Sequence, residues 1–215
     1  YPTLLSQFGT TLVERALIEA FCRIQERSFS DCLRANDFGI RLETFDMRFA
    51  GRSPGELLPA TPRRCIVARH TVGMADPLEN GEIADSARLN DGLPQSLAEC
   101  IQRYGLTHFK LKLSGGTQQD IHRLAQIAAV IDRHVKDDFA FTLDGNESFR
   151  SLESFRDYWE SLSAAPRLAR FLEHAMFVEQ PFHRDVALDR GRLEDLANWN
   201  ERPTLIIDES DADLD

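Results

Sequence analysis

The segment Phe109–Leu113 alternates apolar and basic residues, and this period of two is typical of a β-strand. Three acidic residues follow it at similar intervals: 34 residues separate Lys110 from Asp144, 35 separate Asp144 from Glu179, and 29 separate Glu179 from Asp208. A strand with its returning helix takes roughly 30 residues or more. The spacing therefore predicts parallel strands that alternate with helices.

The two lysines of this segment are expected to share one face of the strand. Lys110 and Lys112 alternate with Phe109, Leu111 and Leu113, so the apolar set would pack under helices and the lysines would point inward. Each of the three acids also closes a short apolar run, which places it at the carboxyl end of its strand. Enzymes built on parallel β/α barrels keep their chemistry at that end.

The remaining elements are predicted from the same kinds of pattern. A first helix is expected over 11–27, beginning at the capping box Thr11-x-x-Glu14, and residues 28–62 are expected to be irregular with one short helix. Further helices are expected at 93–104, 117–135, 151–173 (interrupted at Pro166) and 193–199. Strands are predicted at Cys65–Val72, Thr107–Leu113, Phe139–Asp144, Met176–Glu179 and Thr204–Asp208.

Composition excludes several classes of function. The net charge of −10 argues against a nucleic-acid partner, which would need a basic face. No apolar run is long enough to span a bilayer, so no membrane partner is expected. The four cysteines are scattered without a Cys-x-x-Cys pair, which is typical of reduced thiols in a cytoplasmic protein.

The converging charges suggest a metal site with a base beside it. Each acid taken alone is better explained as a cap of the helix that follows its strand. Three carboxylates at one rim would repel each other unless a hard cation lay among them, and oxygen ligands suit Mg²⁺. Two lysines on one face would lower each other's pKa, and a lysine with a lowered pKa is a competent general base.

Four short motifs, in this order, resemble those of the enolase superfamily, above all its mandelate-racemase and muconate-lactonizing branches. They are Lys-x-Lys at 110–112, Asp-x-Asn at 144–146, Glu-Gln-Pro at 179–181 and Asp-Glu-Ser at 208–210. The resemblance implies that Asp144, Glu179 and Asp208 bind Mg²⁺, that Lys112 is the catalytic base, and that Lys110 tunes it. Asn146 and Glu209 would contact the metal ligands without binding the metal themselves.

The third metal ligand is the least constrained of these assignments. Strand parity does not choose between Asp208 and Glu209, because Ile206 and Ile207 are both apolar. The Asp-Glu-Ser form of the motif is similar to that of the muconate-lactonizing branch, in which the aspartate binds the metal. The resemblance therefore favours Asp208.

The resemblance also implies a function and a fold. The function is Mg²⁺-dependent removal of the α-proton of a small-molecule carboxylate through an enediolate, by a racemase, epimerase or cycloisomerase. The alternatives are a sugar-acid dehydratase of the same superfamily and a catalytically silent fragment. The fold is a TIM-type (β/α) barrel over 61–215 with residues 1–60 as a remnant of an N-terminal capping domain.

The barrel is expected to be incomplete. A closed barrel of this type has roughly eight strands and roughly 250 residues, whereas five strands are predicted here. Members of the superfamily carry a second catalytic group on later strands. We therefore expect the sequence to be the middle of a larger enzyme, and the full-length protein to be a homo-oligomer.

Overall fold

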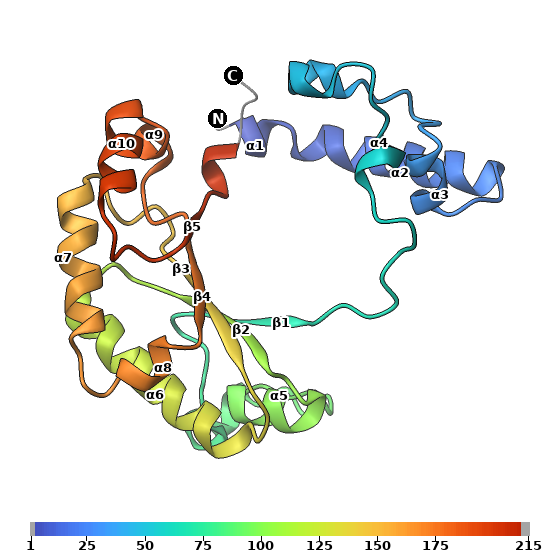
Figure 1. Cartoon of the computed structure of the whole chain (residues 1–215). Coiled ribbons are helices and arrows are strands. Elements are labelled where there is room, and N and C mark those ends of the chain that lie inside the picture. Colours follow the sequence, from blue (N-terminus) through green and yellow to red (C-terminus); the bar gives the residue numbers. More distant parts are fainter. Residues whose placement is uncertain (1–2, 212–215) are drawn as a thin grey trace. The chain divides into compact units, whose positions relative to one another are not determined.

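The computed structural model describes residues 3–211 and divides them into two compact units, one up to Ile66 and one from Val67 to Asp211 (Figure 1). In the second unit, five parallel strands form one sheet in the order β1-β2-β3-β4-β5. The strands are β1 (Arg69–Val72), β2 (His108–Lys112), β3 (Ala140–Asp144), β4 (Ala175–Glu179) and β5 (Leu205–Ile206). The predicted parallel α/β architecture is confirmed, and closure into a barrel stays a prediction.

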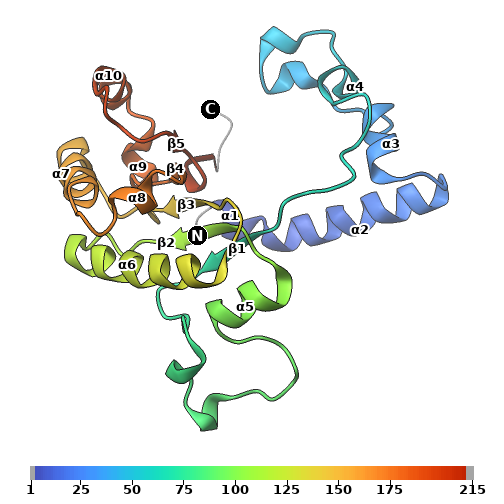
Figure 2. The ribbon, with the colours of Figure 1, turned by 60° about the horizontal axis from the view of Figure 1, so that its bottom comes forward.

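Helices connect the strands of this unit. They are α5 (Leu97–Tyr104), α6 (Thr117–His134), α7 (Leu152–Ser163), α8 (Ala169–Leu172), α9 (Arg184–Ala187) and α10 (Arg190–Asn198). Short 3₁₀ turns lie at Asn80–Glu82, Asp85–Ala87 and Glu209–Asp211. Figure 2 shows that the long connection between β1 and α5 extends away from the strands. Within residues 3–211, no helix is long and apolar enough to cross a membrane.

The predicted alternation of the lysine strand is confirmed. Phe109 and Leu111 are fully buried, whereas Lys110 and Lys112 lie half-buried on the opposite face of β2. The buried face packs against helices, with α5 beside α6 and α6 beside α7 along one side of the sheet (Figure 1). Burial of the apolar face therefore turns both ammonium groups to the other side of the sheet.

Local capping explains where the helices of this unit begin and end. Ser96 accepts a hydrogen bond from the amide of Glu99 at the start of α5, and Gly105 ends that helix in the left-handed conformation with φ of 61°. The stop at Gly105 was predicted. Leu93 lies before the helix with 62% of its surface exposed, so its predicted place on the buried helix face is wrong.

The first unit consists of helices and turns in its described part. The helices are α1 (Thr3–Ser6), α2 (Phe8–Ile24), α3 (Phe29–Arg34) and α4 (Pro54–Leu57), with 3₁₀ turns at Leu42–Thr44 and Met47–Phe49. The predicted capping box is wrong, because α2 begins before Thr11 and the Thr11 hydroxyl donates to the carbonyl of Phe8 inside the helix. A role as a capping-domain remnant stays a prediction.

Two strands are shorter than their apolar runs indicated. β1 begins only at Arg69, and the first half of the predicted strand, residues 65–68, is exposed, with Ile66 at 88%. β5 ends at Ile206, which leaves Asp208 beyond the strand rather than at its last position. A hydrophobic run predicts a strand only where a neighbouring element covers it, and both of these strands lie at edges of the sheet.

Candidate active site at the strand ends

Three of the predicted site residues stand side by side because of strand register. Lys112 of β2 is the register partner of Asp144 of β3, and Asp144 is the partner of Glu179 of β4. Each is the last residue of its strand, as the sequence predicted for Asp144 and Glu179, whereas the lysine strand was expected to end at Leu113. Parallel strands point their carboxyl ends to one edge of a sheet, and ligands of open α/β sheets bind outside that edge.

The lysines and the acids form a continuous ionic cluster. The ammonium nitrogen of Lys110 lies 2.6 Å from Oε1 of Glu179 and 2.8 Å from Oδ2 of Asp144. The ammonium nitrogen of Lys112 lies 2.6 Å from the same Oδ2 of Asp144. Both acids are buried, with 3% and 7% of the side chains of Asp144 and Glu179 exposed. Buried charges of this kind are tolerated only when they are paired.

The ion pairs decide how these groups ionise. Burial alone would raise the pKa of Asp144, but hydrogen bonds from Lys110 and Lys112 outweigh burial and lower it. Burial alone would lower the pKa of Lys110, but its hydrogen bonds to Asp144 and Glu179 raise it instead. The prediction that each lysine lowers the other's pKa is therefore wrong for Lys110, because the two carboxylates that it contacts raise its pKa.

Asn146 contacts the predicted base directly. Its Oδ1 accepts a hydrogen bond of 2.7 Å from the ammonium of Lys112, and its backbone amide donates to Oδ1 of Asp144. The residue adopts a left-handed backbone conformation with φ of 44°, which asparagine tolerates better than most residues. The sequence placed Asn146 behind the ligands, whereas the structure makes it a neighbour of both Lys112 and Asp144.

The acids that follow the fifth strand are arranged differently from those that end the third and fourth. Asp208 is exposed, and its backbone amide donates to Oε1 of Gln180. Glu209 is half-buried, and one of its carboxylate oxygens, Oε2, is buried without a hydrogen-bond partner. Burial and the charges of Asp208, Glu147 and Asp144 raise the pKa of Glu209. Glu209 thus shares an electrostatic environment with Asp144.

Gln180 holds the fifth strand's loop in place, a role that the sequence analysis missed. Its side chain is buried, its Oε1 accepts from the amides of Asp208 and Ser210, and its Nε2 donates to the Ser210 hydroxyl and the Phe182 carbonyl. The sequence signal for this role is a glutamine placed between a strand-end acid and a proline. A side-chain amide buried at that position needs several hydrogen-bond partners, and the loop after β5 supplies most of them.

The carboxylate oxygens at this rim are ligands that suit a hard cation, although the acids do not converge on a single point. Within residues 3–211, no three His, Cys, Asp or Glu side chains lie close enough together to hold a metal ion. Oε2 of Glu179 is buried without a hydrogen-bond partner, and Nη2 of Arg69 lies 3.9 Å from it. Together with the unpartnered Oε2 of Glu209, it offers carboxylate oxygens of the kind that Mg²⁺ takes.

Comparison with known proteins gives one weak likeness. No family model matches the sequence, and no curated protein matches it. Among solved structures, the chain is similar to the O-succinylbenzoate synthase of Thermosynechococcus elongatus, crystallised with magnesium in its active site. The identity is 20%, the TM-score is 0.42, and the match covers 77% of this chain and 41% of that chain. The chain thus spans less than half of that structure's length, and a likeness at this level establishes no shared function.

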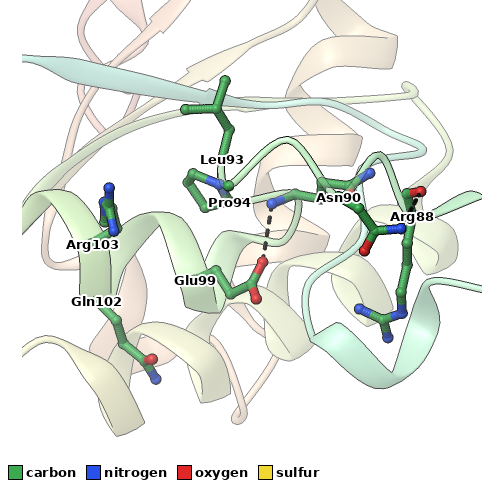
Figure 3. A pocket seen from close by; sticks show the side chains of 9 residues that line it. Arg88, Asn90, Leu93, Pro94, Glu99, Gln102 and Arg103 are labelled. Atoms are coloured by element: carbon green, nitrogen blue, oxygen red, sulfur yellow. Dashed lines mark hydrogen bonds between the residues drawn. The ribbon is translucent and has the colours of Figure 1, made fainter.

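A pocket of about 460 Å³ lies elsewhere in the second unit, between the connection after β1 and helix α5 (Figure 3). Its polar groups are engaged locally, since Glu99 accepts from the amide of Gln95 and the side chain of Asn90 donates to the carbonyl of Arg88. The side chains of Arg88 and Arg103 lie on opposite sides of this view of the pocket (Figure 3). This pocket therefore lacks the convergent charges that mark the strand ends.

Proposed function

We propose that the full-length protein is a Mg²⁺-dependent enzyme of the enolase type, which removes the α-proton of a small carboxylate substrate. The observation that carries the proposal is the cluster of Lys110, Lys112, Asp144 and Glu179 at the carboxyl ends of adjacent parallel strands. The order of the Lys-x-Lys, Asp-x-Asn, Glu-Gln-Pro and Asp-Glu-Ser motifs supports the same reading. An isomerase, either racemase or cycloisomerase, is the reaction type that the motifs favour.

Asp144 and Glu179 would hold the metal ion, with Asp208 as the third ligand and Glu209 beside it. The buried, unpartnered oxygen of Glu179 supports this assignment. A buried carboxylate oxygen without a hydrogen-bond partner destabilises the fold unless a cation binds to it. When bound, Mg²⁺ would neutralise the charge that develops on the substrate carboxylate. Glu209 is the rival third ligand, because its own Oε2 is buried without a partner.

Lys112 would take the α-proton, and Lys110 would act as a fixed charge beside it. The side chain of Lys112 is 29% exposed and that of Lys110 is 14% exposed, so Lys112 is the lysine that a substrate reaches first. Asn146 and Asp144 fix the direction of the Lys112 amine. Lys110 is bound to both acids, which suits a group that balances charge rather than one that moves a proton.

Exchange of the α-proton with solvent tests this function without knowledge of the natural product. The full-length protein is incubated in D₂O with a panel of small carboxylic acids that carry an acidic α-proton, once with Mg²⁺ and once with EDTA. We expect deuterium to enter the α-position of at least one acid only when Mg²⁺ is present. Exchange that persists in EDTA, or in the variant Asp144→Asn, would contradict the proposal. A complete absence of exchange would favour a catalytically silent barrel.

A further inference from the structure

The loops that follow β3 and β4 are joined by backbone hydrogen bonds beyond the ends of their strands. The amide of Gly145 donates to the carbonyl of Glu179, the amide of Glu147 to Gln180, and the amide of Phe149 to Pro181, at 2.8, 2.9 and 3.0 Å. The first loop therefore follows the second for several residues past the sheet.

Within this paired region, two consecutive side-chain-bearing residues adopt the left-handed conformation. Asn146 and Glu147 have φ of 44° and 60°. Such a conformation is unfavourable for residues with a side chain and persists only where surrounding contacts hold it. The loop must therefore be fixed by interactions other than its own backbone preference.

A charged fork supplies that interaction. Oε1 of Glu147 accepts from the backbone amide and Nε of Arg184, and Oε2 accepts from Nη2, at 2.7, 2.8 and 2.7 Å. Glu147 is 17% exposed and Arg184 is 33% exposed, so the pair is shielded from much of the solvent. Bidentate pairs of arginine and carboxylate are stronger and more directional than single contacts.

The turn at Asn146 and Glu147, which Arg184 holds through Glu147, contacts the predicted base Lys112 through Asn146. Asn146 precedes Glu147 in the turn, and its Oδ1 accepts 2.7 Å from the ammonium of Lys112. Its backbone amide, on the same turn, donates to Oδ1 of Asp144, whose other oxygen also contacts Lys112. A movement of the turn would displace two of the groups that hold the Lys112 amine.

We propose that Glu147 and Arg184 are positioning residues that fix the Asn146 turn and thereby hold the Lys112 amine in one orientation. The catalytic meaning of this orientation rests on the proposed function, in which Lys112 is the base. The structural relationship itself can be tested without any activity, because the signals of Lys110, Lys112 and Lys136, the lysines of these 215 residues, can each be assigned by substituting that lysine.

The first readout is the NMR spectrum of full-length protein labelled at the lysine ε-carbons. In the wild type, we expect the two ε-protons of Lys112 and those of Lys110 to be inequivalent, because both side chains are held. Exposed Lys136 should show one averaged signal. Glu147→Gln, which lacks the full charged fork, should collapse the Lys112 pair and leave the Lys110 pair intact. An unchanged Lys112 pair would overturn the proposal.

A second variant and a matched control keep the test decisive. Arg184→Lys keeps the charge but loses the fork, so it should disturb Lys112 less than Arg184→Gln. The control is Asp185→Asn. Asp185 is exposed, follows Arg184 in the sequence, and has its Oδ2 3.6 Å from Nη1 of exposed Arg150. This variant should leave the Lys112 signals unchanged. Persistence of the Lys110 signals shows that each variant has folded. An equal disturbance from Asp185→Asn would show a general effect of rim charge and overturn the proposal.

The second readout is the rate of α-proton exchange. Glu147→Gln should lower kcat about tenfold with little change in KM, the size of effect seen when partners behind a site are lost. If the wild type exchanges no α-proton, the proposed function fails and the lysine spectra still decide the positioning role. If exchange is normal in Glu147→Gln and Lys112 stays ordered, the positioning role fails and the proposed function stands.

Discussion

The ammonium nitrogen of Lys110 lies 2.6 Å from Oε1 of Glu179, so it joins β2 to β4 across the strand between them. It also lies 2.8 Å from Asp144 on that intervening strand. Lys110 is thus a positive charge shared by two buried carboxylates at adjacent strand ends. A divalent cation bound by the same acids would neutralise their charge in place of Lys110.

The first prediction follows because Mg²⁺ and the Lys110 ammonium can each neutralise the same two acids. Lys110→Met should lower the free energy of unfolding by about 3 kcal/mol in the absence of metal, because two buried acids lose a shared partner. Mg²⁺ should restore much of the loss, and so should stabilise the variant more than the wild type. Urea unfolding with and without Mg²⁺ measures both effects. Equal Mg²⁺ stabilisation of the two proteins would contradict a metal site at these acids.

The second prediction concerns the metal ligands. Asp144→Asn and Glu179→Gln should each abolish detectable Mg²⁺ binding in isothermal titration calorimetry, because each removes a carboxylate of the ligand set. Glu173→Gln is the matched control, since Glu173 is exposed and precedes β4 at the opposite end from Glu179. Wild-type affinity in either ligand variant would show that the ion binds elsewhere.

The same titration separates the two candidates for the third ligand. Asp208→Asn should weaken Mg²⁺ binding more than Glu209→Gln if the aspartate coordinates the ion. The reverse order would assign the ligand to Glu209, in keeping with its half-buried position and unpartnered oxygen.

The third prediction concerns the close approach of the loops after β3 and β4. A Cβ added at Gly145 would lie 2.6 Å from Cα of Pro181, which is backbone and cannot move aside cheaply. Gly145→Ala should therefore lower the free energy of unfolding by about 1–3 kcal/mol. Gly191→Ala is the control, because Gly191 lies in α10 with nothing within 4 Å of the added atom. It should stabilise the protein by about 0.5–1 kcal/mol.

The fourth prediction is a pH dependence of stability. The hydrogen bonds from Arg184 lower the pKa of Glu147 from the ordinary value of 4.5 to about 2. A carboxylate whose pKa is lower in the folded state stabilises the protein above its unfolded pKa and loses that contribution as the pH falls. The stability difference between wild type and Glu147→Gln should thus be full at pH 7 and shrink between 4.5 and about 2.

Urea unfolding at a series of pH values measures that difference. The control is Glu153→Gln, which removes an exposed carboxylate of α7. A difference between wild type and Glu147→Gln that stays constant from pH 7 to below 4.5 would show that the ion pair adds nothing to stability.

The sequence predicted the parts of this structure that depend on local pattern and burial. The alternation of Phe109 and Leu111 with Lys110 and Lys112 determines both the strand and the face of the lysines, because only the apolar set can be buried. Asp144 and Glu179 were placed at strand ends because each follows a short apolar run, and the register then aligns them.

The parts that it missed depend on contacts between segments distant in the chain. Glu147 and Arg184 are separated by 37 residues, and neither stands in a pattern that indicates a partner. The extent of β5 depends on whether another element covers it, so the apolar run to Ile207 overstated the strand. The capping box at Thr11 satisfied the local rule, but the helix begins earlier, at Phe8.

The fifth prediction tests the central claim, that Lys112 removes the α-proton at this rim. The measurement is the rate at which solvent deuterium enters the α-position of an active carboxylate, in full-length wild type, Lys112→Ala and the control Lys136→Ala. The account predicts normal exchange in Lys136→Ala and loss of exchange from the Lys112 side in Lys112→Ala, with Mg²⁺ still bound by calorimetry. Wild-type exchange in Lys112→Ala would contradict it.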